Sequence, residues 1–233
     1  MLPDSFKAMK TLFRLTIPAL AMVLLPGAGL AQNSVSFYPR VGLLAPDTYL
    51  YEQYENFVGD APTEWSTGSL GRSLLIGVGM ELKLGDSGLL IRGEIGRSFE
   101  GWLRVSHSVI VPRMFFNPPY IYTTWLDAPY TMTTTSLQLV LPTRLTLWRA
   151  EPYVVAGGGG KLYEFGETTL PNEVDAVLPT DGFTWGGDVG AGITMPLFGN
   201  LTLDLQARDA FSKYWGKWQH DFIYSGALFL KFG

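Results

Sequence analysis

Apolar side chains recur at every second position through several long segments, and this period of two constrains the fold more than any other feature. Side chains of an extended strand alternate between two faces, so each segment predicts a β-strand with one apolar and one polar face. The segment from Ser73 to Leu84 is the clearest, with only Leu75 intruding on the polar face. The apolar faces hold Leu74, Ile76, Val78, Met80, Leu82 and Leu84; Leu201, Leu203, Leu205 and Ala207; and Tyr224, Gly226, Leu228, Leu230 and Phe232.

The first 31 residues have the features of a secretory signal peptide. Basic residues precede a short apolar run, and small residues follow as a cleavage site. Pro18, Pro26 and the shortness of the run argue against an uncleaved anchor. We expect translation to start at Met1 or Met9 and cleavage after Ala31, which leaves residues 32–233 as one domain. The three parts are the cations Lys7, Lys10 and Arg14, the run Leu15–Leu25 and the site Gly29–Ala31.

Composition narrows the classes of function. The sequence has no cysteine, which excludes disulfides, thiolate metal sites and a lipid-modified cysteine. A net charge of −4 offers no basic face for nucleic acid. The 27 glycines and 15 prolines argue against a helical bundle, because both residues weaken helix interiors. We expect no cofactor, since no nucleotide motif or metal cluster is recognisable.

The connections between strands decide between a soluble sandwich and a membrane barrel. No later segment approaches the roughly 20 apolar residues of a transmembrane helix. Short connections (Gly85–Gly88, Trp148–Glu151, Leu197–Gly199) alternate with long ones (Ala45–Ser69, Ser108–Tyr130, Gly166–Asp181, Ser212–His220). This alternation is typical of outer-membrane barrels, which have short periplasmic turns and longer extracellular loops.

Eight strands follow from these connections, and aromatic residues near their ends resemble the girdles of a membrane barrel. The fold class that we predict is all-β: an eight-stranded antiparallel up-and-down transmembrane β-barrel, following a cleaved signal peptide. Because eight is even, both ends of the barrel lie on the periplasmic side. The strands are expected near 34–44, 71–84, 89–107, 131–147, 152–165, 182–196, 200–211 and 221–232, and the aromatic residues are Phe99, Trp185, Phe222, Tyr224 and Phe232.

Three glycine-rich or alternating runs resemble the small OmpA-type outer-membrane β-barrel family. They are Pro152–Gly160, Gly186–Gly192 and Leu203–Asp209. The strand from Tyr224 to Phe232 resembles the C-terminal signal that the outer-membrane assembly machinery reads, although Gly233 follows the final aromatic residue here. The resemblance covers nearly all of the mature chain. It implies the outer membrane of a diderm bacterium as the location, with outer-membrane lipids and the assembly machinery as partners.

Charged residues of both signs fall on the polar faces of the predicted strands. An eight-stranded barrel has an interior that side chains just fill, and unpaired buried charges are costly. We therefore expect a salt-bridged, largely closed lumen, with a gated pore as the alternative. The expected network is Glu81, Lys83, Arg92, Glu94, Glu100, Arg104, Arg144, Lys161, Asp188, Asp204, Arg208 and Lys231.

The second long loop is rich in aromatic residues. Exposed aromatic side chains on this scale often mark a contact site, and packing of these residues on one another is the alternative. The loop defines no particular extracellular ligand. The candidate contact residues are Arg113, Phe115, Phe116, Tyr120, Tyr122 and Trp125.

The two histidines, His107 and His220, raise the possibility of a lipid-modifying enzyme. Catalysis would require a serine and an acid beside the histidine. Ser106, Ser108 and Glu100 are near His107 in sequence, but adjacent strand residues point to opposite faces. We therefore expect no enzymatic activity and no catalytic residues.

These observations favour a non-enzymatic outer-membrane barrel with a structural or surface-contact role. The alternatives are a small channel for ions or hydrophobic solutes, a lipid-modifying enzyme, and a secreted lipocalin-like binder. The last would require its apolar faces to turn inward.

Overall fold

The computed structural model describes residues 34–47, 49–58, 61–84, 88–99, 101–111, 119–143, 145, 148–166 and 179–232. The predicted signal peptide lies outside these residues. No helix in the described ranges is long and apolar enough to cross a membrane. Eleven strands are found there: β1 (Val35–Pro46), β2 (Tyr49–Val58), β3 (Ala61–Leu70), β4 (Ser73–Leu84), β5 (Leu89–Phe99), β6 (Gly101–Val111), β7 (Tyr120–Pro142), β8 (Glu151–Phe165), β9 (Gly182–Phe198), β10 (Leu201–Tyr214) and β11 (Lys217–Phe232).

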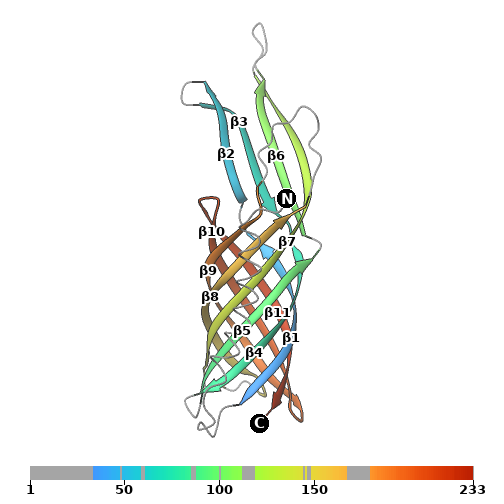
Figure 1. Ribbon diagram of the computed structural model, residues 1–233, viewed down its shortest axis with the longest axis vertical. Helices are drawn as coiled ribbons and strands as arrows, with labels where there is room; N and C mark the ends of the chain where they lie inside the picture. The colour runs from blue at the N-terminus through green and yellow to red at the C-terminus, as the bar shows by residue number, and fades with distance from the viewer. Residues whose placement is uncertain are drawn as a thin grey trace, which may run out of the picture. The chain divides into compact units, whose positions relative to one another are not determined.

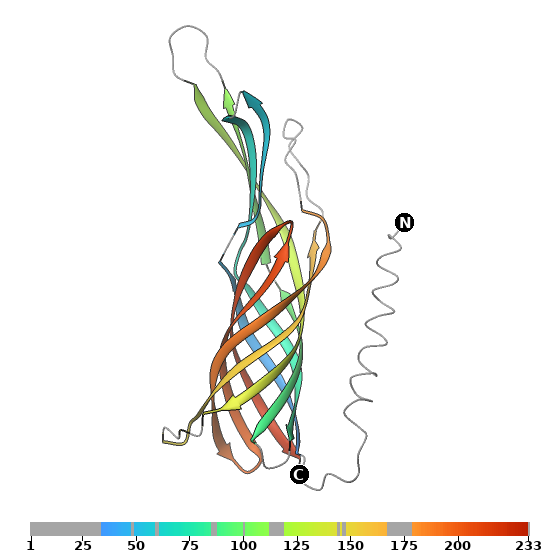
Figure 2. The same ribbon diagram turned by 90° about the vertical axis from the view of Figure 1, so that its left-hand side faces the viewer.

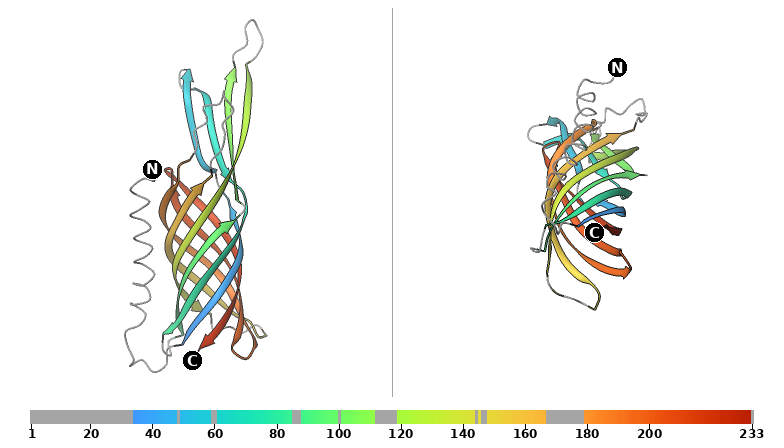
Figure 3. Two further views of the ribbon diagram at one scale, coloured as in Figure 1. Left: turned by 45° about the vertical axis from the view of Figure 1, so that its right-hand side comes forward. Right: turned by 60° about the horizontal axis from the view of Figure 1, so that its bottom comes forward.

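Eight of the described strands close into an antiparallel barrel (Figures 1 and 3). Their order is β7-β5-β4-β1-β11-β10-β9-β8, and β8 pairs with β7 to complete the ring. The closing pairs run from Tyr130↔Phe165 to Pro142↔Tyr153. The first and last strands, β1 and β11, are neighbours. The predicted eight-stranded, all-β antiparallel barrel is therefore confirmed.

Alternation places the apolar side chains on the outside of the barrel. On β7, Leu137, Leu139 and Leu141 are about half exposed, whereas Gln138 and Val140 between them are buried. The predicted outward face of β4 behaves in the same way, with Leu74, Ile76 and Val78 exposed. An apolar exterior around a polar interior is the reverse of a soluble barrel and is the arrangement found in membrane barrels.

An extension of the same sheet continues beyond one end of the barrel (Figure 2). We call it the external sheet; it consists of β2, β3, β6 and the first part of β7, residues 120–130. The prediction of long loops over Ala45–Ser69 and Ser108–Tyr130 was therefore wrong for most of these residues. Strands form there because β2 pairs with the following strand β3, β6 pairs with the following strand β7, and β3 pairs with β6 to join the two hairpins.

One extra residue separates β5 from β6 as they follow the same partner, β7. The pair Arg97↔Thr133 is followed by the pair Gly101↔Tyr130. Between these two pairs the chain advances four residues from β5 to β6 but only three residues along β7. A β-bulge of this kind reverses which residues face inward. Even-numbered Arg92 is buried on β5, whereas odd-numbered Leu103 and Val105 are buried on β6.

The connection from β10 to β11 is a tight turn and not the long loop predicted over Ser212–His220. Trp215 and Gly216 both have positive φ, at 48° and 78°. Positive φ at both central residues characterises the two-residue hairpin turn whose twist matches that of its strands. The hairpin contacts the base of the external sheet, where Lys217 pairs with Glu52 at 2.8 Å.

A buried apolar cluster lies where the barrel meets the external sheet. It combines side chains of both parts, including Leu44 and Ile223 of the barrel and Leu50 and Leu103 of the external sheet. The other members are Tyr51, Leu70, Leu75, Val105, Ala128, Tyr130, Met132, Tyr163, Ala210 and Tyr214.

Candidate functional site

Charged side chains from three strands meet inside the barrel. Arg40 of β1 lies 2.5 Å from Glu94 of β5 and 3.3 Å from Asp204 of β10. Arg208 reaches Glu94 at 2.9 Å, and Arg92 reaches Asp204 at 3.3 Å. All five side chains are at most 5% exposed. Because each buried charge has an opposite partner, the cost of removing it from water is offset.

Two further carboxylates extend this network along the lumen. Glu81 accepts hydrogen bonds from Nε and Nη2 of Arg92, at 3.1 and 2.7 Å. Asp188 lies 3.3 Å from Arg208 and accepts a hydrogen bond from the Gln138 amide at 2.7 Å. Charge-assisted bonds of this kind are short and directional, so they fix the side chains across the lumen.

Aromatic rings surround the Arg92 guanidinium. Its carbon lies 5.1 Å from the ring centre of Tyr153 and 5.0 Å from that of Phe229, within cation–π range. The hydroxyl of Tyr153 donates to Asp204 at 2.7 Å, and that of Tyr38 donates to Glu94 at 2.8 Å. The rings thus fill space and complete the hydrogen bonding of the carboxylates.

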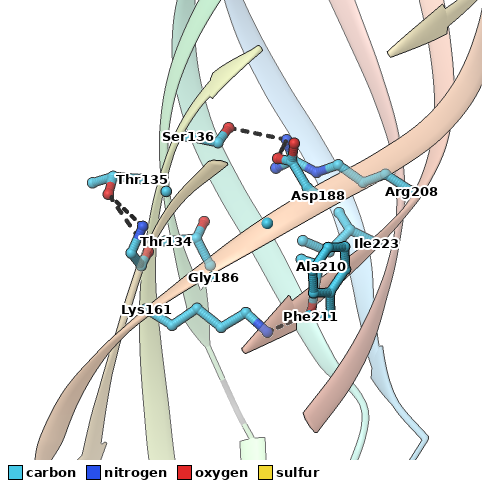
Figure 4. Close-up of a pocket in the computed structure, with 13 residues that line it drawn as sticks. Thr134, Thr135, Ser136, Lys161, Gly186, Asp188, Arg208, Ala210, Phe211 and Ile223 are labelled. Atoms are coloured by element: carbon cyan, nitrogen blue, oxygen red, sulfur yellow. Dashed lines mark hydrogen bonds and ion pairs between the residues drawn. The ribbon is translucent and has the colours of Figure 1, made fainter. Parts of the chain in front are cut away.

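A second ion pair lies nearer the external sheet. Nζ of Lys161 lies 2.5 Å from the Asp221 carboxylate and also donates to the carbonyl of Ala210. Tyr163 donates to the same carboxylate at 3.3 Å. Between this pair and Asp188 is a cavity of about 20 Å³ (Figure 4), which is room for about one water molecule.

Seven of the twelve residues expected in the lumen lie inside the barrel. Arg40 and Asp221 are inside as well, although the sequence analysis omitted both. Arg40 could have been found, since it shares the inward face of β1 with Tyr38. Asp221 was assigned to the predicted strand 221–232, as its first residue, but was not included among the lumen charges. The seven are Glu81, Arg92, Glu94, Lys161, Asp188, Asp204 and Arg208.

Two of the expected lumen residues lie elsewhere. Arg104 is 60% exposed and pairs with Asp127 at 2.8 Å, because the bulge after β5 turns even-numbered residues of β6 outward. Lys83 is exposed at the end of β4, one residue from the strand terminus. Glu100 and Arg144 lie outside the described residues, as does the side chain of Lys231.

The Arg104–Asp127 pair belongs to the outer face of the external sheet. Two hydrogen bonds from Arg104, at 2.8 and 3.0 Å, hold the pKa of Asp127 below its usual value. Trp102 and Trp125 are exposed on the same face. Tyr120 and Tyr122 are exposed on the opposite face, because residues of a strand alternate. The candidate contact residues are thus divided between two surfaces, and Arg113, Phe115 and Phe116 lie outside the described residues.

His107 is paired with residues that the sequence analysis did not consider. Its Nε2 lies 3.0 Å from Glu64, and its Nδ1 lies 3.0 Å from the hydroxyl of Ser66 on the neighbouring strand. In a neutral ring that donates from Nε2, Nδ1 accepts from Ser66, which is the hydrogen-bond order of a Ser-His-acid triad. Ser66 is only 1% exposed, however. A cross-strand network that satisfies buried polar groups accounts for the arrangement.

Other polar contacts of the described residues lie outside the lumen network, among them Arg97 with Glu164 at 2.9 Å. His220 pairs with Asp209 at 2.8 Å near the β10–β11 hairpin. Ser106 is hydrogen-bonded to Thr67 and Ser108 to Thr123, on the face opposite His107. Among the described residues, no group of three His, Cys, Asp or Glu side chains could hold a metal ion.

No family model and no curated protein matches this chain. Among solved structures, it is similar to Neisserial surface protein A, with 10% identity, a TM-score of 0.49, and coverage of 86% of this chain and 99% of that one. It is also similar to the N-terminal β-barrel domain of Pseudomonas aeruginosa OprF, with 10% identity, a TM-score of 0.44, and coverage of 86% and 100%. For the Yersinia pestis attachment invasion locus protein Ail, the values are 11%, 0.40, 86% and 97%.

Proposed function

We propose that this protein is a non-enzymatic barrel of the outer membrane of a diderm bacterium, with a closed lumen and an external sheet that makes contacts at the cell surface. The observation that carries the proposal is the combination of an apolar exterior with a charged interior. Exposed leucines and valines circle the barrel, while the ion pairs of Arg40, Arg92 and Arg208 cross its centre. Lipid is the solvent that such an exterior requires.

The closed lumen is supported by the buried ion pairs that cross it and by the small size of the space left between its side chains. A conducting pore needs a continuous water path, whereas the cavity in Figure 4 has about 20 Å³. Beyond Lys161 and Asp221, the apolar cluster around Leu44 and Ile223 occupies the end of the barrel. Such a cluster excludes hydrated ions, because it offers them no ligands.

Planar-bilayer recording of the purified protein tests the closed lumen. We expect no steps above the baseline at ±100 mV in 1 M KCl, with an open porin as the positive control. Reproducible single-channel steps from the wild-type protein would overturn this part of the proposal and favour a small channel.

A surface-contact role is supported by the external sheet, which has two exposed aromatic surfaces. Trp102 and Trp125 lie on one, and Tyr120 and Tyr122 on the other. Intact cells that display the protein should be retained on alkyl-coated or polysaccharide-coated plates more than cells without it. The double change Trp125→Ser and Tyr122→Ser should reduce retention, whereas Trp218→Ser on the hairpin should not. Equal retention of all four cell types would contradict the contact role.

The non-enzymatic part of the proposal is supported by the burial of Ser66. A nucleophile must reach its substrate, and the Ser66 residue is 1% exposed. A small fluorophosphonate should therefore leave Ser66 unlabelled in the folded protein. Labelling of Ser66 that is lost in His107→Gln would show an activated serine and would refute this part.

Contact with the outer-membrane assembly machinery also belongs to the proposal. It is supported by the position of β11, which pairs with β1 and so closes the barrel with the last strand of the chain. Exchanging the outward residues Tyr224 and Leu228 for serine should lower the amount of folded protein in the membrane fraction.

A further inference from the structure

The outer wall of the barrel contains an apolar groove of about 810 Å³, which crosses β8, β9, β10, β11 and β1. None of the described residues that line it is charged. The outward-facing residues that define it are Val154, Ala191, Leu205, Ala207, Tyr224 and Gly226.

Small residues create the groove. Ala207 of β10 pairs with Ala191 of β9, so two methyl groups lie side by side where most of the wall has larger side chains. On the other side Gly226 of β11 pairs with Leu205 of β10. Tyr224 and Leu205 are exposed beside this floor and form its walls. The depression therefore follows from the sequence of three adjacent strands.

The surroundings of the groove identify its occupant. Val41, Val154, Leu205 and Tyr224 are all 43–54% exposed and belong to the apolar exterior of the barrel. In a bilayer this exterior is solvated by acyl chains, so an acyl chain is the group available to fill a depression in it. An unfilled depression would forfeit the dispersion contacts of every atom that lines it.

One end of the groove lies at Thr143 and Pro152, where β7 is connected to β8. Trp148 in this connection is fully exposed. Tryptophan is enriched at the membrane–water interface. A lipid headgroup at this interface would leave its chain directed along the groove toward Tyr224 and Gly226.

We propose that this groove is a binding site for one acyl chain of a phospholipid of the periplasmic leaflet. The site rests on the proposed function, because it requires that the barrel span a membrane. It goes beyond that function because it names the ligand, a phospholipid, and the place on the barrel wall where that ligand binds.

Variants that fill the groove test the proposal. At Gly226, an added Cβ would meet only Leu205 Cδ2 at 3.4 Å and the Asp204 carbonyl at 3.8 Å, so a side chain is accommodated and points into the groove. Gly226→Leu and Ala207→Leu should each fill it. The matched control is Ala156→Leu, since Ala156 is also exposed on β8 but does not line the groove.

The protein should be reconstituted in vesicles of phosphatidylethanolamine and phosphatidylglycerol, extracted, and delipidated stepwise in detergent before native mass spectrometry. We expect the wild-type protein and Ala156→Leu to retain one phospholipid. Each groove-filling variant should retain at least fivefold less. Ala207→Leu keeps the test valid if Gly226→Leu folds poorly.

Three outcomes would overturn the site. They are a wild-type protein that retains no phospholipid, equal retention by all variants, and wild-type dimers that the groove-filling variants abolish, which would make a second copy of the chain the occupant. Failure of the proposed function would look different, because the protein would then remain soluble without detergent and would not enter the vesicles.

Discussion

Replacement of Arg92 by methionine tests whether the charges of the lumen are held in a dry network of ion pairs. Arg92 is 0% exposed and binds three partners: Glu81 through two hydrogen bonds, Tyr153 at 3.1 Å and Asp204 at 3.3 Å. Methionine is unbranched and flexible, so it can pack in the space of the aliphatic part of Arg92 beside the aromatic rings. The change therefore removes the charge and the hydrogen bonds with little change of packing.

The expected loss of stability follows from the partners that remain. Asp204 is also fully buried, but it keeps Arg40 at 3.3 Å and the hydroxyl of Tyr153 at 2.7 Å. Removal of one member of a buried ion pair costs about 3–5 kcal/mol. We expect the lower limit, about 3 kcal/mol, because Asp204 keeps two partners. With a urea m-value of about 3 kcal/mol per M, the midpoint of unfolding falls by about 1 M.

The assay is urea unfolding of the protein in lipid vesicles, followed by tryptophan fluorescence and by mobility in unboiled gels. The double variant Arg92→Met with Asp204→Asn should be more stable than Arg92→Met alone, since it removes one of the four buried carboxylates that would otherwise share only Arg40 and Arg208. Lys217→Met is the control for an exposed pair and should change the free energy of unfolding by about 1 kcal/mol or less. A midpoint for Arg92→Met within about 0.2 M of the wild type would refute the dry network, because water would then have replaced the lost partner.

Three further predictions concern other parts of the molecule. Gly159→Val should give no folded barrel on unboiled gels, because an added Cβ would overlap the carbonyl oxygen of Thr135, whereas Gly226→Ala should fold. The Arg104→Met change should raise the pKa of Asp127 toward its usual value in an NMR titration; no change would mean that the exposed pair does not form in solution. His107→Leu should expose the external sheet to protease while the barrel stays resistant, since it removes the partner of the buried Ser66 hydroxyl and the ion-pair partner of Glu64. Equal protease resistance of that variant and the wild type would exclude a stabilising role for the histidine.

The barrel could be predicted from the sequence because its exterior and interior impose opposite chemistry on alternate residues. On β10, Leu205 faces outward between Asp204 and Gln206, and the pattern alone gives both the strand and the face of each side chain. The same reasoning predicted most of the charged residues of the lumen. It could not predict which of them form ion pairs, since nothing local to Arg92 indicates that Asp204, on a strand far away in sequence, lies beside it.

The external sheet was missed for a related reason. Its strands have polar and aromatic residues on both faces, so no face is marked by an apolar pattern. The two hairpins β2–β3 and β6–β7 are joined by pairing between segments far apart in sequence, as in Ser66↔His107. The bulge before Gly101 left no signal either, because one extra residue changes no composition. Its consequence was the inverted assignment of Arg104, which shows that period-two reasoning holds only as far as the next bulge.

The charged lumen also specifies the register of the barrel. Shifting a strand by one residue would move its whole inward face to the outside. On β10 such a shift would transfer Asp204 and Arg208 into the layer that holds Leu205 and Ala207, and charges are costly there if the exterior faces lipid. It would also leave Glu94 without the guanidinium that lies 2.9 Å away. Alternative registers are thus penalised on both sides of the wall. A closed barrel of alternating strands has few other features that distinguish the correct register from the shifted ones. The charge network therefore has a role in folding, and this role requires neither conduction nor catalysis.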